Sequence, residues 1–88
     1  MLNDSYPDQT EVLVGTLVVG DTVQRERFNR RLGQHEIMEC RVVHAVNGRV
    51  GTRYVGRTGR EFGEVREYNH PEDYAILLRP SMYPRASR

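Results

Sequence analysis

The dipeptide Asn47-Gly48 limits the possible fold more than any other feature of this sequence, because strand-like patterns lie on both sides of it. An Asn-Gly pair favours the tight turn of a β-hairpin, since both residues tolerate a positive φ angle. In the segment before it, Glu39 and Arg41 fall on one parity and apolar or neutral residues fall on the other: Met38, Cys40, Val42 and His44. This alternation predicts a half-buried strand that pairs with a second strand after the turn.

Two loop lengths fit this turn, and they place the side chains on different faces. A two-residue loop would put Val42 and His44 on the same face as Arg49 and Arg53. A three-residue loop, Val46-Asn47-Gly48, instead groups the apolar residues of both strands: Met38, Cys40, Val42, Val50, Thr52 and Tyr54. Because a one-residue slip reverses the faces of a strand, we predict the three-residue loop, a type I turn plus bulge with Gly48 in the left-handed position.

The predicted register gathers arginines on the solvent face of the hairpin. We call them the arginine stripe: Arg41, Arg49, Arg53 and Arg57. The stretch from Gly48 to Arg60 contains four glycines, four arginines and no acidic residue. Guanidinium groups make planar, bidentate contacts with carboxylates and phosphates. We therefore predict that the stripe is a partner-binding surface, although the acidic residues of 61–75 in this chain could also neutralise it.

Further segments indicate a chain rich in β-structure. We predict a strand over Glu11–Val19 with a bulge or sharp bend at Gly15, an irregular strand from Glu61 to Tyr68, and a buried closing strand from Tyr74 to Pro80. Residues 22–32 fit either a short helix that ends at Gly33 or a twisted strand plus loop, and we expect a helix or an irregular excursion. Five to six short strands with glycine punctuation predict a mainly β fold, a small partly open barrel of the SH3-like or OB-like type.

Length and charge define the expected organisation. Eighty-eight residues allow one domain, which we divide into an N-terminal arm (1–10), a β-barrel (11–79) and a C-terminal arm (80–88). The net charge is only +1, but residues 22–60 carry nine arginines against three glutamates, whereas residues 61–75 have a net charge of −4. The lone Cys40 excludes an internal disulfide. Without a signal peptide or transmembrane run, we expect an intracellular, cytoplasmic protein, or a virion protein if it is phage-encoded, with no membrane partner.

Patterns that carry catalysis or metal binding are weak. Gly51 to Thr58 resembles a phosphate-binding loop with Arg57 in place of lysine, but no helical pattern follows it. Cys40 and His44 would lie about 13 Å apart along a strand, too far to share one zinc ion. We expect no catalytic residue, no cofactor and no metal; if the protein were an enzyme, the candidates would be Glu64, His70 and Asp73.

These features predict a non-enzymatic binding or assembly module. It would dock on a protein partner, or on copies of itself, through the arginine stripe and the arms, where Met82 and Tyr83 offer an apolar anchor. A virion component, a phage-encoded inhibitor or a subunit of a larger complex would fit. The alternative is a nucleic-acid-binding barrel that uses the same arginines. That alternative lacks aromatic residues beside the stripe, because Tyr54 points inward in the predicted register.

Overall fold

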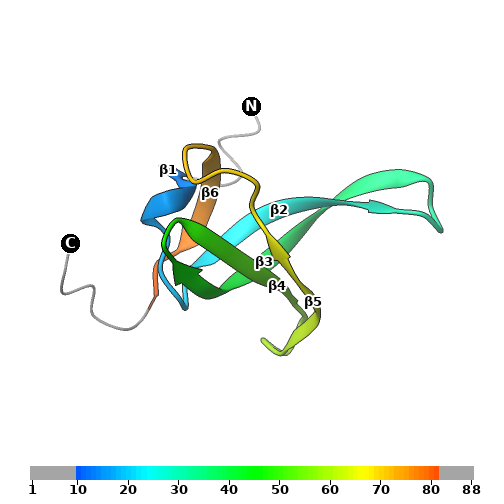
Figure 1. Ribbon diagram of the computed structural model, residues 1–88. Coiled ribbons are helices and arrows are strands. Elements are labelled where there is room, and N and C mark those ends of the chain that lie inside the picture. The colour runs from blue at the N-terminus through cyan, green and yellow to red at the C-terminus, as the bar shows by residue number, and fades with distance from the viewer. Residues whose placement is uncertain (1–9, 82–88) are drawn as a thin grey trace.

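A computed structural model describes residues 10–81, which form one antiparallel sheet curled into a partly open barrel (Figure 1). Its strands are β1 (Thr10–Leu13), β2 (Thr22–Asn29), β3 (Gln34–Val46), β4 (Arg49–Val55), β5 (Glu61–Glu67) and β6 (Tyr74–Arg79). They are ordered β1-β6-β2-β3-β4-β5, so consecutive strands β2 to β5 are neighbours and β6 returns to lie beside β2. Strands β1 and β5 are the two edges of the sheet, and the predicted mainly β, partly open barrel is confirmed.

The helix expected near residues 22–32 is wrong. Residues Thr22–Asn29 are strand β2, and the following turn leads directly into β3. Val23 is buried and pairs with Cys40 of β3. Only Val23, Phe28 and Leu32 supported a helical stripe, and pairing with the long strand β3 outweighs so thin an apolar pattern.

The predicted first strand is shorter than expected. Strand β1 ends at Leu13, and a 3₁₀ turn, η1 (Val14–Thr16), bends the chain at Gly15 toward the barrel. The turn is held against the β5–β6 connection, because the N–H of Val14 donates to the carbonyl of Asp73 (2.7 Å) and that of Gly15 to Pro71 (2.8 Å). The bend brings Leu17 into the core.

The Asn47-Gly48 hairpin is confirmed, but its predicted loop length is wrong. Val46 pairs with Arg49, so the loop has two residues, and Asn47 (φ 53°) and Gly48 (φ 79°) both adopt the positive φ angles of a type I′ turn. The register is restored by a bulge between Val42 and His44. Val42 therefore stays on the inward face as predicted.

The bulge also reverses the orientation of His44. This residue was expected on the face of Cys40 and Val42, but it lies on the outer face, opposite Gly51. Cys40 and Val42 lie opposite Tyr54 and Thr52, so the predicted inward face of the hairpin is otherwise right.

The core is small and aliphatic. It consists of seven buried residues from the strands and the η1 segment: Val14, Leu17, Val23, Cys40, Val42, Val50 and Ala75. Burial raises the pKa of the Cys40 thiol, which fits its predicted role as a small core residue. No helix within residues 10–81 is long and apolar enough to cross a membrane.

Candidate functional site

Three residues of the arginine stripe lie on the outer face of the sheet, where strand β5 supplies acidic partners: Arg41, Arg49 and Arg53. Arg41 and Arg53 face each other across β3 and β4. Both approach the carboxylate of Glu61 in β5, with N–O distances of 3.3 Å for Arg41 and 3.9 Å for Arg53. The Nε–H of Arg53 also donates to the carbonyl of Gly63 at 2.9 Å. The Glu61 carboxylate and the Gly63 carbonyl thus serve as acceptors for two arginines of the stripe.

A second glutamate of β5 satisfies Arg49. Its Nη2 lies 3.1 Å from Oε1 of Glu67, and Nε2 of His44 lies 3.0 Å from Oε2 of the same carboxylate. The hydrogen bond from Arg49 lowers the pKa of Glu67, and His44 adds to the effect. These contacts are exposed to solvent, which screens them, so they add little to stability.

Gly51 allows His44 to lie across the outer face of β4. A Cβ atom at this position would be 2.4 Å from Cε1 of His44 and 2.7 Å from Cγ1 of Val65. We expect Gly51→Ala to push His44 away from Glu67 and to lower the free energy of unfolding by about 1 kcal/mol. Urea denaturation and the NMR shifts of the His44 ring measure the two effects.

Gly56→Ala is the matched control, because the nearest atom to a Cβ there would be 3.6 Å away. Equal results for the two variants, with the His44 signals unmoved, would contradict the described packing of His44 over Gly51.

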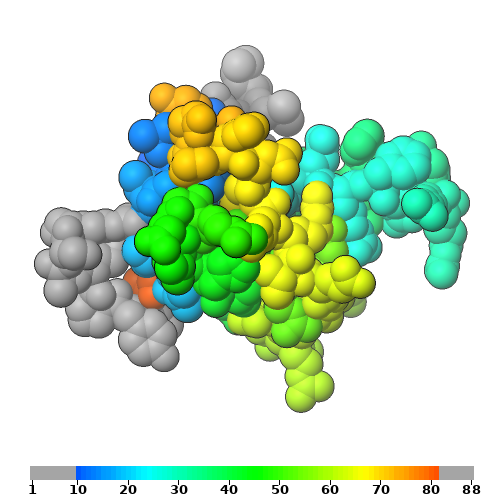
Figure 2. Space-filling model, viewed as in Figure 1, coloured from blue at the N-terminus to red at the C-terminus, as the bar shows by residue number. Residues whose placement is uncertain are grey.

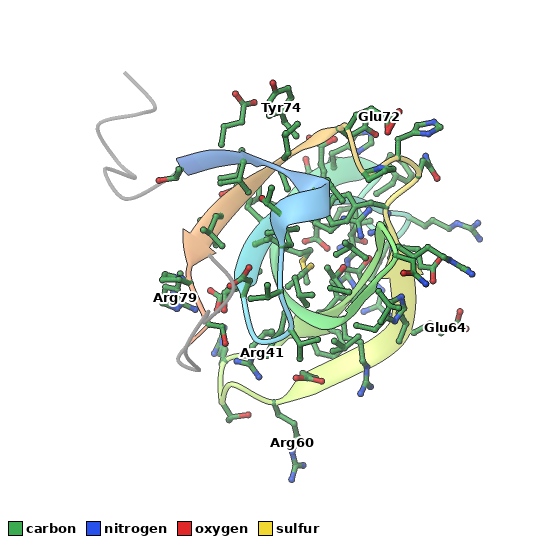
Figure 3. All side chains as sticks on the ribbon, turned by 60° about the vertical axis from the view of Figure 1, so that its left-hand side comes forward. Arg41, Arg60, Glu64, Glu72, Tyr74 and Arg79 are labelled. Carbon is green, nitrogen blue, oxygen red and sulfur yellow. The ribbon has the colours of Figure 1, made fainter. Side chains whose placement is uncertain are left out.

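The stripe is therefore largely neutralised within this chain. Arg41, Arg49 and Arg53 contact Glu61 or Glu67, and only Arg57, in the exposed turn after β4, makes no hydrogen bond or ion pair among residues 10–81. Figure 3 shows Arg60, from the same turn, pointing away from the barrel, while Glu72 and Tyr74 lie at the opposite end. The other two predicted partner-binding residues, Met82 and Tyr83, lie outside the described residues.

A group that the sequence analysis missed lies on the inward face, where β2 and β5 approach each other. We call it the arginine–tyrosine cluster: Arg25, Arg66, Tyr54 and Tyr68. The Arg25 guanidinium lies 3.8 Å from the centre of the Tyr68 ring and donates to Thr52 Oγ1 and to the carbonyl of Arg66, both at 3.0 Å. Nη1 of Arg66 donates to the Tyr54 hydroxyl at 2.9 Å.

Burial changes the properties of this cluster. It lowers the pKa of Arg25 and raises that of Tyr68. The Tyr68 hydroxyl oxygen is buried and has no hydrogen-bond partner among residues 10–81. In a strand over residues 22–29, Arg25 lies on the same face as Val23, because side chains two residues apart point the same way. The sequence therefore contained a signal for this cluster, but the prediction of a helix did not use it.

The far half of the β2–β3 hairpin projects from the barrel as a separate arm (Figures 1 and 2). Phe28 pairs with His35 and Glu26 with Ile37, so Phe28 and Ile37 share one face of the arm. The exposed fractions are 52% for Phe28, 59% for Ile37 and 62% for Leu32 in the turn. We call these three residues the apolar hairpin face.

The other face of the arm is polar and internally bonded. Glu36 accepts hydrogen bonds from Arg27 (3.0 Å) and Asn29 (3.1 Å), and the Asn29 side chain accepts two backbone N–H bonds from the turn. The arm is thus an ordered ribbon. One of its faces exposes Phe28 and Ile37, and it also carries Glu26 and His35, whose Oε1 and Nδ1 atoms lie 3.6 Å apart.

The three residues named as candidates for an enzyme are all exposed. Glu64 is exposed on β5, and His70 and Asp73 are exposed in the β5–β6 connection. Across the described part of the chain, no three His, Cys, Asp or Glu side chains are grouped so that they could hold a metal ion.

Comparison with family models, curated proteins and solved structures finds no match for this chain. Its function therefore has to be inferred from three surfaces: the self-neutralised stripe, the arginine–tyrosine cluster and the apolar hairpin face.

Proposed function

We propose that this protein is a non-enzymatic docking module that binds a protein partner through the apolar hairpin face. The observation that carries the proposal is the exposure of Phe28, Leu32 and Ile37, each more than half exposed, on an arm that projects from the barrel. Single exposed apolar residues are common in soluble proteins, but large ones grouped on one element mark interaction surfaces.

The arm is suited to docking because its shape is already set. Every residue of β2 pairs with β3, out to Asn29 opposite Gln34. The His35 ring packs edge-on against Phe28, with 5.1 Å between ring centres. An ordered arm loses little conformational entropy on binding. Burying each large apolar side chain at an interface then contributes about 1.5–3 kcal/mol.

The charged residues around the apolar hairpin face indicate which charge the partner's surface carries. Arg30 and Arg31 are exposed in the turn beside Leu32 and form no ion pair among residues 10–81. A complementary surface therefore has an apolar centre and an acidic rim. A second copy of this chain is one such partner, since it exposes carboxylates such as those of Glu64 and Glu72 (Figure 3).

The double variant Phe28→Ser with Ile37→Ser tests the proposal. We expect association to weaken about 100-fold, because two apolar contacts at the centre of the interface are lost. Sedimentation equilibrium over a concentration series measures self-association. Affinity chromatography from the cells that make the protein, with quantified recovery of each retained protein, measures binding to other partners.

The control is Val19→Ser with Val46→Ser, which removes two exposed apolar side chains that are not on the apolar hairpin face. If both double variants retain the wild-type association, or lose it equally, the arm is not the docking surface.

Binding of nucleic acid through the arginine stripe stays a prediction. No contact in the structure favours it, because Glu61 and Glu67 already satisfy three of the four arginines. The contribution of Met82 and Tyr83 to docking likewise stays a prediction.

A further inference from the structure

Two arginines of the sheet differ from the others because they contact no acidic side chain in the described part of the chain. Five of the seven strand arginines contact glutamates: Arg27 with Glu36, Arg41 and Arg53 with Glu61, Arg49 with Glu67, and Arg79 with Glu39. Arg25 and Arg66 donate only to neutral oxygens within residues 10–81. Burial is the largest cause that lowers the pKa of Arg25, and the positive charge of Arg66 lowers it further, so the two arginines interact electrostatically.

The side-chain hydrogen bonds of Arg25 and Arg66 among residues 10–81 all come from Nη1. Arg25 uses Nη1 for its contacts with Thr52 and the Arg66 carbonyl, and Arg66 uses Nη1 for the Tyr54 hydroxyl and, at 3.5 Å, the carbonyl of Glu26. The Nε–H and Nη2–H donors of both side chains make no hydrogen bond within the described residues. This edge grips a carboxylate or a phosphate with two parallel hydrogen bonds.

Aromatic rings surround the same arginines. Tyr68 lies under Arg25, and the Tyr54 ring has its centre 5.9 Å from the Arg66 guanidinium. Phe62, opposite Tyr54 on β5, is 40% exposed, and the two ring centres are 5.5 Å apart. Tyr54 thus links Phe62 to Arg66, since it contacts both. Single-stranded nucleic-acid sites combine exposed aromatic rings with positively charged side chains.

We propose that Arg25, Arg66 and Phe62 form a binding site for single-stranded nucleic acid, with a phosphate on the open guanidinium edges and a base stacked on Phe62. The stripe on the outer face has arginines without aromatic residues, whereas this site has both. Single strands are favoured over duplexes because only unpaired bases can stack on a protein ring. The site is separate from the apolar hairpin face.

An acidic peptide is the competing ligand, and the geometry of β5 argues against it. A peptide would bind most simply by adding a strand to the free edge of β5. Gly63 has a φ of 83°, and the pairing of β5 with β4 shifts register between Thr52 and Tyr54. Such a bulge twists an edge strand and disfavours continuous pairing with another chain.

Fluorescence anisotropy with a labelled oligothymidylate of about twelve nucleotides tests the proposal, with a duplex of the same length for comparison. We expect wild-type protein to prefer the single strand. Arg66→Gln should weaken that binding about tenfold and reduce the salt slope by about one, and Phe62→Leu should also weaken it about tenfold. Tripolyphosphate, which has no base, should bind Phe62→Leu as well as it binds wild type.

Arg60→Gln is the matched control, since it removes the same charge from an exposed residue that points away from the barrel (Figure 3). Urea midpoints verify that each variant is folded.

Absence of wild-type binding at physiological salt overturns the proposal. Equal losses of oligonucleotide affinity in Arg66→Gln and Arg60→Gln also overturn it. Equal competition by polyglutamate would assign the site to an acidic peptide instead. The Phe28→Ser, Ile37→Ser protein should bind the oligonucleotide normally, which separates this site from the docking arm.

Discussion

Replacement of Asp21 by alanine should lower the free energy of unfolding by about 3 kcal/mol, a large part of the stability of a domain this small. Asp21 is 0% exposed. Its Oδ2 accepts the N–H of Val18 at 2.9 Å and its Oδ1 accepts the N–H of Ser81 at 2.7 Å. The backbone carbonyl of Asp21 also accepts the N–H of Val42 at 2.8 Å. The residue therefore ties the segment after η1 to the end of β6 and to β3, and alanine would leave both carboxylate-bound N–H groups without their acceptor.

Two further variants separate this role from a general effect of charge. Asp21→Asn keeps one acceptor oxygen but turns an NH₂ group toward the other backbone N–H, so its loss should be intermediate. Asp73→Ala, at an exposed residue, should change the free energy of unfolding by less than about 0.5 kcal/mol. Urea denaturation at 25 °C measures all three. An Asp21→Ala protein as stable as Asp73→Ala would show that the carboxylate does not hold these segments together.

Replacement of Leu17 by alanine should cost about 3 kcal/mol, the usual range for truncating a buried leucine. Leu17 is 3% exposed although it lies between η1 and β2, outside any strand. It packs with the strand valines of the core. In a core of seven small residues, the cavity left by three missing carbons is a substantial defect.

Leu32→Ala removes the same atoms from an exposed leucine and should change stability by less than about 0.5 kcal/mol. Thermal and urea unfolding of both variants measure the difference. Comparable stabilities would mean that the η1 segment is not part of the core.

The centre of the sheet could be predicted from the sequence because short-range signals agree there. Asn47-Gly48 marks a turn, and the alternation of Met38, Cys40 and Val42 defines the inward face of β3. The bulge near His44 could not be predicted, since nothing in the local pattern distinguishes a three-residue loop from a two-residue loop combined with a bulge earlier in β3. Both keep Val42 inside, and only the bulge turns His44 outward.

The binding surfaces were harder to predict because they depend on which strands become neighbours. Three arginines of the stripe were placed on the correct face, whereas Arg57 lies in the turn after β4. The neutralisation of the three requires Glu61 and Glu67 to lie beside β4, which follows from the pairing of β5. Strand β2 was missed because its inward side continues past Val23 with Arg25, a residue that alternation rules assign to solvent. That same departure from the pattern marks the arginine–tyrosine cluster.

The most direct test of the docking arm is photo-crosslinking with benzoylphenylalanine in place of Phe28, in the cells that make the protein. Tyr74, which is also an exposed aromatic residue but lies at the start of β6 rather than on the arm, is the control position. Docking through the apolar hairpin face predicts one discrete crosslinked product, a dimer or a single partner, from position 28 and none from position 74. A product from position 74 alone, or no product from either position, would contradict it.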